Sequence, residues 1–257
     1  MHVSALAITP VKGTRLMSVE RVRVERHGVR ENRRFYLIDE RDRMVNAKSL
    51  GRLQTVLSRY DDAARRLELE FPDGRIVVGS VRLGERITTR FYSRQARAHH
   101  VLGEWSEAIS EYIGKPLWLV EADEDGAVDR GAPGAVSLIS RASLQRLAQE
   151  GGLQELDARR FRMLIEIDGV GAHEEDAWVQ RRVSAGEALI APRGHVGRCL
   201  ITSRDPDTGE VDVPTLDLLG GYRRDEPTTE PLPFGIFGEV LRAGTVAVGD
   251  PVSVSRG

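Results

Sequence analysis

The N-terminal half of the chain alternates between apolar and charged positions, which is the pattern of half-buried β-strands. In segment 19–25, Val22 and Val24 fall on one face and charged side chains fall on the other. Three further strands are predicted, at 34–39, at 67–71, where the alternation recurs, and at 75–78. Pro72-Asp-Gly74 is a strong turn signal, so the last two are expected to form a hairpin.

Two segments change to the period of a helix. In segment 103–113 the apolar residues recur at i, i+3, i+4 and i+7, which predicts an amphipathic helix ending near Gly114. A second helix is expected to begin at Ser140 or Ser143, because either hydroxyl can cap the first turn. Gly151 is expected to end it.

The remaining C-terminal sequence returns to short strands, predicted at 161–167, 183–190, 196–202, 238–241 and 245–254. Many short strands with few helices predict a mainly β or α+β protein, with β-barrel architecture and a few peripheral helices. Segment 122–134 is acidic, then rich in Gly and Pro, and is the best candidate for a linker. The chain is therefore expected to divide into parts 1–121 and 122–257.

Composition narrows the class of protein and its partners. The 37 basic residues nearly balance the 39 acidic ones among 257, so charge gives no reason to expect a nucleic-acid partner. No apolar run approaches the roughly 20 residues that span a bilayer, and the first residues lack the basic start of a signal peptide. We therefore expect a cytoplasmic protein with no membrane partner.

The chain lacks the common signatures of nucleotide and metal sites. It has neither Gly-x-Gly-x-x-Gly nor a phosphate loop, and no Gly-x-Ser-x-Gly nucleophile elbow. His-x-x-x-His and Cys-x-x-Cys spacings are also absent from the sequence, so a zinc site with four protein ligands is not expected.

Cys199 is the only cysteine, which excludes a disulfide within the chain. It lies where a Gly-rich segment meets a predicted strand, next to Arg198 and near His195 and Arg204. Neighbouring cations favour a thiolate if they point toward the sulfur. A thiolate suits soft metals, persulfides and nucleophilic catalysis. A lone cysteine is also commonly a small buried apolar residue, and the spacing alone leaves both interpretations open.

Segment 198–209, Arg-Cys-Leu-Ile-Thr-Ser-Arg-Asp-Pro-Asp-Thr-Gly, resembles the signature of the MOSC superfamily, which is named after the C-terminal domain of molybdenum cofactor sulfurase. The resemblance is strongest to the group that contains the mitochondrial amidoxime reducing component and its bacterial relatives. Further matching pieces follow in the family's order along nearly the whole chain: 9–13, 34–37, 46–53, 140–144, 160–162, 175–178, 233–235 and 244–250.

This resemblance implies an N-terminal MOSC-associated β-barrel domain over 1–121 and a MOSC domain over 122–257, with a molybdopterin cofactor between them. It implies that the thiolate of Cys199 binds molybdenum, which makes Cys199 both the metal ligand and the catalytic residue. The residues that would bind the phosphate and pterin are Lys12, Thr14, Arg34, Arg162 and Arg198. Pyridoxal phosphate is not expected.

The leading hypothesis from the resemblance is a molybdenum-dependent oxidoreductase that reduces small N-hydroxylated or N-oxygenated substrates. A separate electron-transfer protein is required, because the chain has no flavin or nicotinamide signature and one cysteine cannot hold an iron–sulfur cluster. The alternative is a sulfur-transfer protein, in which Cys199 carries a persulfide or attacks a C–S substrate in a biosynthetic pathway. A third possibility is a cofactor carrier without turnover.

Several positions depart from the family's pattern. Gly13 stands where a serine is expected, so Thr14 would have to supply the hydroxyl. Met163-Leu164 replaces a Pro-Asn pair, and Lys48 and Gly51 replace arginine and proline. These changes leave the predicted fold intact and leave the substrate open.

Overall fold

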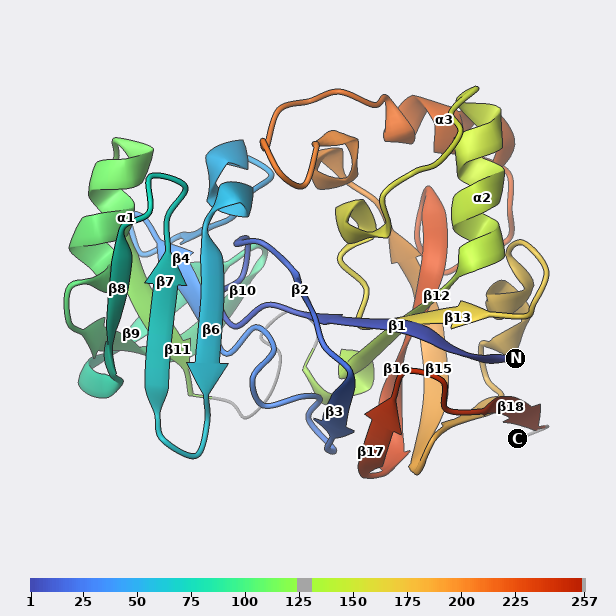
Figure 1. Cartoon of the computed structure of the whole chain (residues 1–257), viewed down its shortest axis with the longest axis horizontal. Coiled ribbons are helices and arrows are strands. Elements are labelled where there is room, and N and C mark those ends of the chain that lie inside the picture. The colour runs from blue at the N-terminus through green and yellow to red at the C-terminus, as the bar shows by residue number, and fades with distance from the viewer. Residues whose placement is uncertain (124–130, 256–257) are drawn as a thin grey trace.

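The computed structural model describes residues 1–123 and 131–255. Most of the predicted linker, 124–130, lies outside the described residues. Figure 1 shows two bodies side by side, with α1 (Trp105–Ile113) at one end and α2 (Arg141–Glu150) and α3 (Thr215–Tyr222) at the other. The mainly β architecture predicted from the sequence is confirmed.

The first body holds two antiparallel sheets. One has the order β5-β4-β11-β10-β9 and the other β6-β7-β8. Phe35 and Leu37 of β4 pack with Leu67 and Leu69 of β7 in a shared apolar core, against which α1 also lies. The strands span β4 (Phe35–Ile38), β5 (Met44–Val45), β6 (Leu57–Asp61), β7 (Arg66–Glu70), β8 (Ile76–Ser80), β9 (Arg82–Phe91), β10 (Arg94–Leu102) and β11 (Trp118–Ala122).

The second body is built on an eight-stranded sheet of order β18-β14-β15-β16-β12-β13-β1-β2. Its only parallel pair among the described strands is β12–β13, which α2 connects. Its strands span β1 (His2–Ile8), β2 (Met17–Ser18), β12 (Val136–Ser140), β13 (Ile165–Asp168), β14 (Arg182–Ala185), β15 (Ala188–Gly197), β16 (Pro233–Arg242) and β18 (Val252–Ser255).

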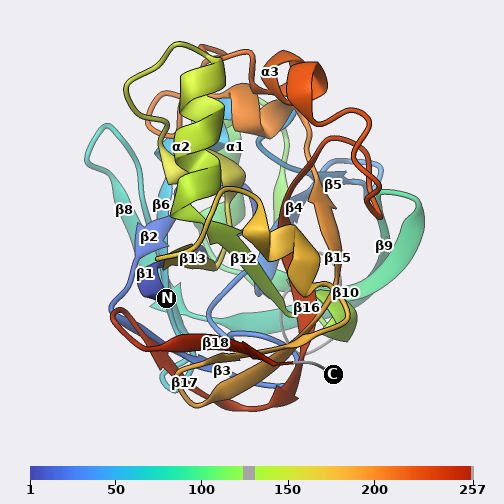
Figure 2. The same ribbon diagram turned by 90° about the vertical axis from the view of Figure 1, so that its right-hand side faces the viewer.

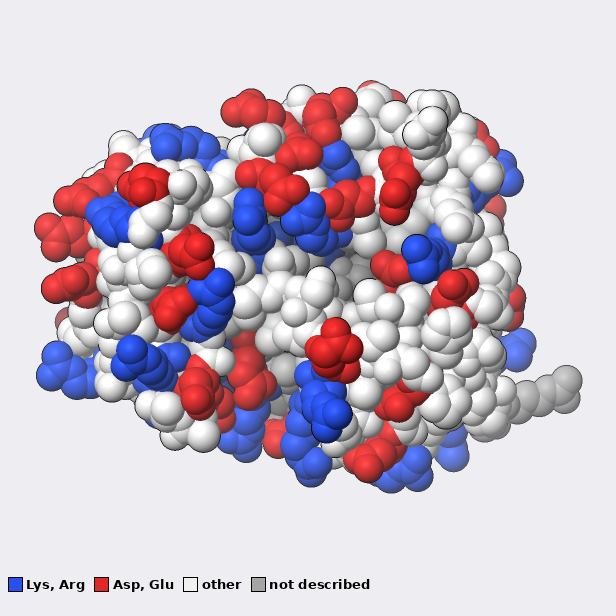
Figure 3. All heavy atoms as spheres, in the orientation of Figure 1, with Lys and Arg blue, Asp and Glu red and all other residues white. Residues whose placement is uncertain are grey.

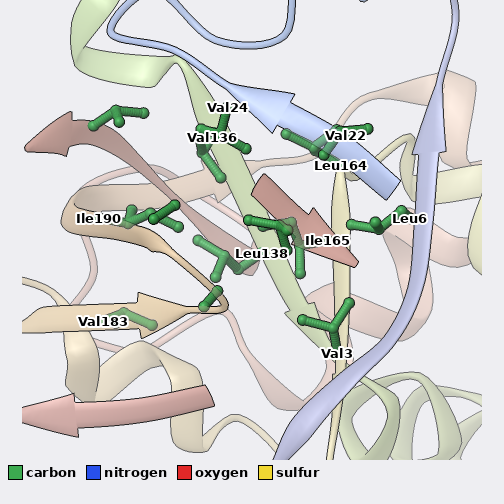
Figure 4. Packing of buried hydrophobic residues seen from close by; sticks show 14 of the residues in the cluster. Val3, Leu6, Val22, Val24, Val136, Leu138, Leu164, Ile165, Val183 and Ile190 are labelled. Atoms are coloured by element: carbon green, nitrogen blue, oxygen red, sulfur yellow. The ribbon is translucent and has the colours of Figure 1, made fainter. Parts of the chain in front are cut away.

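A small sheet of β3 (Arg21–Val24) and β17 (Gly244–Ala247) closes one end of this second body, as Figure 2 shows. The curled sheet encloses a core of aliphatic side chains. In Figure 4, Val3 and Leu6 of β1 point toward Ile165 of β13 and Leu138 of β12. The interior of this half-barrel is therefore completed by the first residues of the chain.

The first strand belongs to the sheet of the C-terminal half. Residues of β1 pair antiparallel with β13, with Leu6 opposite Ile165. Figure 1 accordingly shows β1 running from the junction of the two bodies to the N-terminus, which lies on the same side as the C-terminal strand β18. The division of the chain at 121/122 stays a prediction. In the fold, β1, β2 and β3 pack within the second body, although they precede this division.

Most of the predicted elements are confirmed. Strands at 19–25, 34–39, 67–71 and 75–78 are present as β3, β4, β7 and β8. Both helices have the expected ends: Gly114 is left-handed with φ 77°, and the hydroxyl of Ser140 accepts the amide of Ser143 at 3.1 Å.

Four C-terminal strand predictions were wrong in part. Segment 196–202 is not a strand, because β15 ends at Gly197 and Leu200–Ser203 forms a 3₁₀ turn, η5. Its backbone turns because the amide and hydroxyl of Thr202 both donate to the carbonyl of Cys199, at 3.0 and 3.1 Å.

Segment 161–167 begins in a second 3₁₀ turn, η3 (Ala158–Phe161), and becomes a strand only at Ile165. Segments 183–190 and 245–254 are each divided between two strands. The long hairpin of β9 and β10 and helix α3 were not predicted. Within the described ranges, no helix has the length and apolar character of a membrane span.

Candidate functional site

A cavity of about 380 Å³ lies where the two bodies meet, and we call it the Cys199 cavity. Lys12, Asn46 and Tyr92 line it from the first body, and Arg162 and Cys199 line it from the second. The cavity is thus formed by segments that are far apart in sequence. It contains four of the residues predicted from the sequence: Lys12, Arg162, Arg198 and Cys199.

The charges around the Cys199 cavity have one sign. Five cationic side chains line it, and no carboxylate does among the residues that the structure describes. Clefts lined by one sign of charge concentrate ligands of the opposite sign. The cavity therefore favours an anionic ligand. The five are Lys12, Arg33, Lys48, Arg162 and Arg198.

Cys199 is exposed, which excludes the interpretation of a small buried apolar residue. Its position is fixed by the backbone on both sides. It follows the last residues of β15 and precedes η5, where it has extended dihedral angles of φ −137° and ψ 175°. Because its carbonyl accepts two hydrogen bonds from Thr202, the main chain is held while the thiol stays accessible.

Arg198 braces the segment that carries Cys199. Its Nε donates to the carbonyl of Phe234 at 2.9 Å and its Nη1 to the carbonyl of Phe161 at 2.8 Å. Its Nη2 lies 3.1 Å from the sulfur of Met163, and the guanidinium lies 5.4 Å from the centre of the Phe161 ring. The guanidinium of Arg198 thus donates to backbone carbonyls of the protein itself, and these hydrogen bonds connect the end of β15 to η3 and β16.

Two arginines interlock across the junction of the bodies. The Nη2 of Arg33 donates to the carbonyl of Arg162 at 2.6 Å, and the Nη2 of Arg162 donates to the carbonyl of Thr14 at 2.7 Å. Both residues have left-handed backbones, with φ 54° and 56°. A non-glycine residue in this conformation costs on the order of 1 kcal/mol and persists only where its surroundings fix it. The two residues with strained backbones therefore lie in the wall of the Cys199 cavity.

Lys12 lies in the segment between β1 and β2, where the chain runs beside β4 of the first body. Its amide donates to the carbonyl of Phe35 at 2.8 Å, which fixes the backbone. Its ammonium lies 5.6 Å from the ring centre of Phe91 and 5.9 Å from that of Tyr92. Aromatic faces attract cations at these distances. The two rings therefore hold the charge of Lys12 at the cavity.

A buried polar cluster supports the start of α2. Glu175 is fully buried, and its Oε1 accepts from the amide of Ser140 at 3.1 Å and the hydroxyl of Ser143 at 2.7 Å. Burial raises the pKa of Glu175. The amide of His173 also donates to the Ser143 hydroxyl, at 2.8 Å, and burial lowers the pKa of His173 to about 4. Ser140 and Ser143 therefore serve the helix end, as expected.

Comparison with known families places the chain. A model described as "MOSC domain" matches residues 125–253, and one described as "MOSC N-terminal beta barrel domain" matches residues 1–116. This chain belongs to the MOSC family. The family expected from segment 198–209 is therefore confirmed.

The MOSC chain is similar along most of its length to proteins named for amidoxime reduction. "Mitochondrial amidoxime reducing component 2" of Bos taurus is 25% identical, covering 97% of this chain and 82% of the relative. The component 1 of Danio rerio is 26% identical over 97% of this chain and 83% of the relative.

The human component 2 is 34% identical over 108 residues, which is 38% of this chain and 31% of the human protein. The match thus spans about a third of the length of the human protein. Among solved structures, the YuaD protein of Bacillus subtilis covers 99% of this chain and 95% of its own, with a TM-score of 0.46 and 11% identity.

Two residues expected to bind the cofactor do not line the Cys199 cavity of this MOSC protein. Thr14 is fully buried, and its hydroxyl bonds with those of Thr9 at 2.8 Å and Ser58 at 2.7 Å. Arg34 instead turns to Glu121, which its Nε and Nη2 contact at 2.9 and 2.8 Å. Their roles stay predictions.

Arg33, next to Arg34, does line the MOSC cavity and was not predicted. Lys48, noted only as a departure from the family's pattern, lines it too. The sequence offered two adjacent arginines before Phe35 and no signal to choose between them. Lys48 carried the signal of a basic residue within a family motif, where it takes the place of an arginine.

Proposed function

We propose that this MOSC protein is a molybdenum-cofactor oxidoreductase that reduces small N-hydroxylated compounds. The observation that carries the proposal is the Cys199 cavity, which combines five cations, no carboxylate among the described residues and an exposed thiol. Similarity to proteins named amidoxime reducing component supports it. The net reaction converts R–NH–OH, two electrons and two protons into R–NH₂ and water.

The residues of the cavity fit a molybdopterin. That group carries a phosphate, a polar pterin and two sulfurs, so it needs cations, planar donors and a soft ligand for its metal. Lys12 offers a compact charge suited to phosphate, and Arg33 and Arg162 offer planar hydrogen-bond donors. Cys199 would hold the metal through its thiolate. When bound, the cofactor supplies the two-electron redox chemistry.

The chain's other contributions are positional. Arg198 fixes the backbone that presents Cys199, because its guanidinium is bonded to two carbonyls. Met163 and Leu164 are buried apolar residues that form part of the wall. The electrons come from a separate electron-transfer protein, since the single cysteine of the sequence cannot hold an iron–sulfur cluster.

The test uses protein purified from a host that makes molybdenum cofactor. Metal content is measured by mass spectrometry, and turnover of benzamidoxime is measured with a chemically reduced dye as electron donor. We expect close to one molybdenum per chain, and loss of both metal and turnover in Cys199→Ala. Lys12→Ala and Arg33→Ala are expected to lower the metal content, whereas Arg41→Ala, at an exposed turn, keeps it. Turnover that survives in Cys199→Ala would overturn the proposal.

The exposed thiol also supports a second candidate, sulfur transfer through a persulfide on Cys199. Intact-protein mass spectrometry distinguishes it. A mass gain of one sulfur atom that a reductant removes, in protein without molybdenum, would favour this candidate. Stoichiometric molybdenum with no turnover of any N-hydroxylated substrate would instead indicate a cofactor carrier.

A further inference from the structure

A second cavity, of about 670 Å³, lies on the outer face of the eight-stranded sheet. Ala5 and Ala7 of β1 and Ile139 of β12 line it from the sheet. Leu153 and Leu156, which follow α2, line it from the other side. Figure 3 shows this face with blue and red side chains gathered above an uncharged area in the middle, where β1 runs. We call it the β1 cavity.

The walls of the β1 cavity are largely apolar. Ala5 and Ala7 lie outside the half-barrel core, whereas Leu6 belongs to that core and also lines the cavity. Ile139 and Leu156 instead belong to the apolar cluster beneath α2 and α3. Ligand pockets are typically concave and mostly apolar, with a few polar groups that fix orientation. This cavity has that composition and the volume of a small-molecule site.

Both arginines at the β1 cavity are already matched by carboxylates. Arg159 contacts Asp157 at 2.6 Å and Asp207 at 2.7 Å. The Nη1 and Nη2 of Arg160, which is 5% exposed, contact the two oxygens of Asp212 at 2.6 and 2.5 Å. Because these carboxylates balance both guanidinium charges, the arginines leave no excess positive charge in the cavity.

Two further carboxylates, Glu155 and Glu166, line the β1 cavity and form no ion pair within the part of the chain that the structure describes. Glu166 lies opposite Ala5 across the β1–β13 pair, and its Oε1 accepts a hydrogen bond from the hydroxyl of Ser4 at 3.0 Å. Glu155 is exposed and forms no ion pair with any described residue. The β1 cavity is therefore acidic, whereas the Cys199 cavity is cationic. The two cavities share Met163 and Leu164 as lining residues.

We propose that the β1 cavity binds an organic cation with an apolar body, such as an aryl amidinium or an alkyl amine. The body lies against the alanines and leucines, and the cationic N–H groups donate to Glu155 and Glu166. Charge-assisted hydrogen bonds to carboxylates are about twice as strong as neutral ones, so they select a cation over a neutral molecule of the same shape. This site is separate from the proposed reductase site and does not depend on it.

Three probes of similar shape and different charge test whether the β1 cavity selects a cation. Binding to the purified chain is measured by calorimetry with benzamidine, which is cationic, benzamide, which is neutral, and benzoate, which is anionic. We expect benzamidine to bind, benzamide to bind about tenfold more weakly and benzoate not to bind, because only the first offers a charged donor. Hexylamine extends the test to alkyl amines. Equal binding of benzamidine and benzamide would overturn the proposal.

Variants locate the binding. Glu155→Gln combined with Glu166→Gln keeps the shape and removes the charge, and is expected to weaken benzamidine about tenfold or more. Ala5→Phe fills the cavity and is expected to abolish binding. Glu40→Gln, at an exposed turn of the first body, is the matched control and keeps full affinity. Cys199→Ala should also bind normally. If the double glutamine variant, folded by its melting curve, binds benzamidine as the wild type does, the site is refuted.

Discussion

Arg34→Ala is expected to destabilise the fold and to leave the Cys199 cavity intact. The guanidinium of Arg34 is 15% exposed and contacts Glu121, whose side chain is 2% exposed. Arg65 holds the same carboxylate from the other side, at 3.0 and 2.9 Å. Removing Arg34 leaves a buried carboxylate with one of its two cations. The loss therefore falls on the free energy of unfolding.

The size of the effect follows from the burial. Breaking a buried ion pair by removing one partner costs about 3–5 kcal/mol. Because Arg65 remains, we expect the lower end, about 3 kcal/mol. For a chain of this length, each kcal/mol corresponds to about 2–4 °C, so the melting temperature should fall by about 6–12 °C. Arg41→Ala, which removes an exposed arginine, should shift it by less than about 2 °C.

The assay combines urea unfolding with metal content. The effect of Arg34→Ala is measured in the wild-type chain and in a Glu121→Gln variant, which lacks the buried negative charge. In the Glu121→Gln variant the loss of unfolding free energy should be at most half as large. At a temperature where Arg34→Ala is folded, its molybdenum content should match that of the wild type. Arg33→Ala should have a lower molybdenum content. The reasoning fails if Arg34→Ala melts like the wild type but loses the metal, since that behaviour belongs to a ligand-binding side chain.

Three further changes test the supporting structure. Ser140→Ala removes the cap of α2 and should cost about 1 kcal/mol in urea unfolding, with exposed Gln145→Ala as the neutral control. His173 has a pKa lowered from 6.5 to about 4, so the stability that it contributes is full above pH 6.5 and is lost as the pH falls toward 4. His173→Gln should therefore flatten the decline of stability with falling pH. Parallel pH profiles for the variant and the wild type would contradict this expectation. Gly235→Ala, at φ 79° with atoms 2.7 and 2.8 Å from the added Cβ, should lower the free energy of unfolding by about 2 kcal/mol. Gly249→Ala, at φ 89° in open space, should lower it less.

Local patterns predicted the local structure well. Alternating apolar residues around Val22 and Val24 gave a strand, and the spacing from Trp105 gave α1, because each depends on one buried face. Segment 196–202 failed because β-branched residues favour strands only until a competing contact intervenes. There the hydroxyl of Thr202 bonds with that of Thr215, 13 residues later, at 2.7 Å.

The same limit applies to the candidate site. Lys12 and Cys199 could be predicted because they lie in recognisable motifs. The choice between Arg33 and Arg34 could not, because it depends on a left-handed backbone at Arg33, and a shift of one residue reverses which side chain faces the cavity. The β1 cavity left no trace in the sequence, since its walls come from strands paired across more than 150 residues.

The pairing of β1 with β13 sets an order of events during synthesis. His2 lies opposite Asp168, so β1 is synthesised 166 residues before the strand with which it pairs. At about 5–20 residues per second that delay is roughly 8–33 s. Until then Val3, Leu6 and Ile8 lack the rest of their core, whereas all the strands of the first body are made before β13. The nascent chain thus carries an uncovered apolar strand, the kind of segment that chaperones bind.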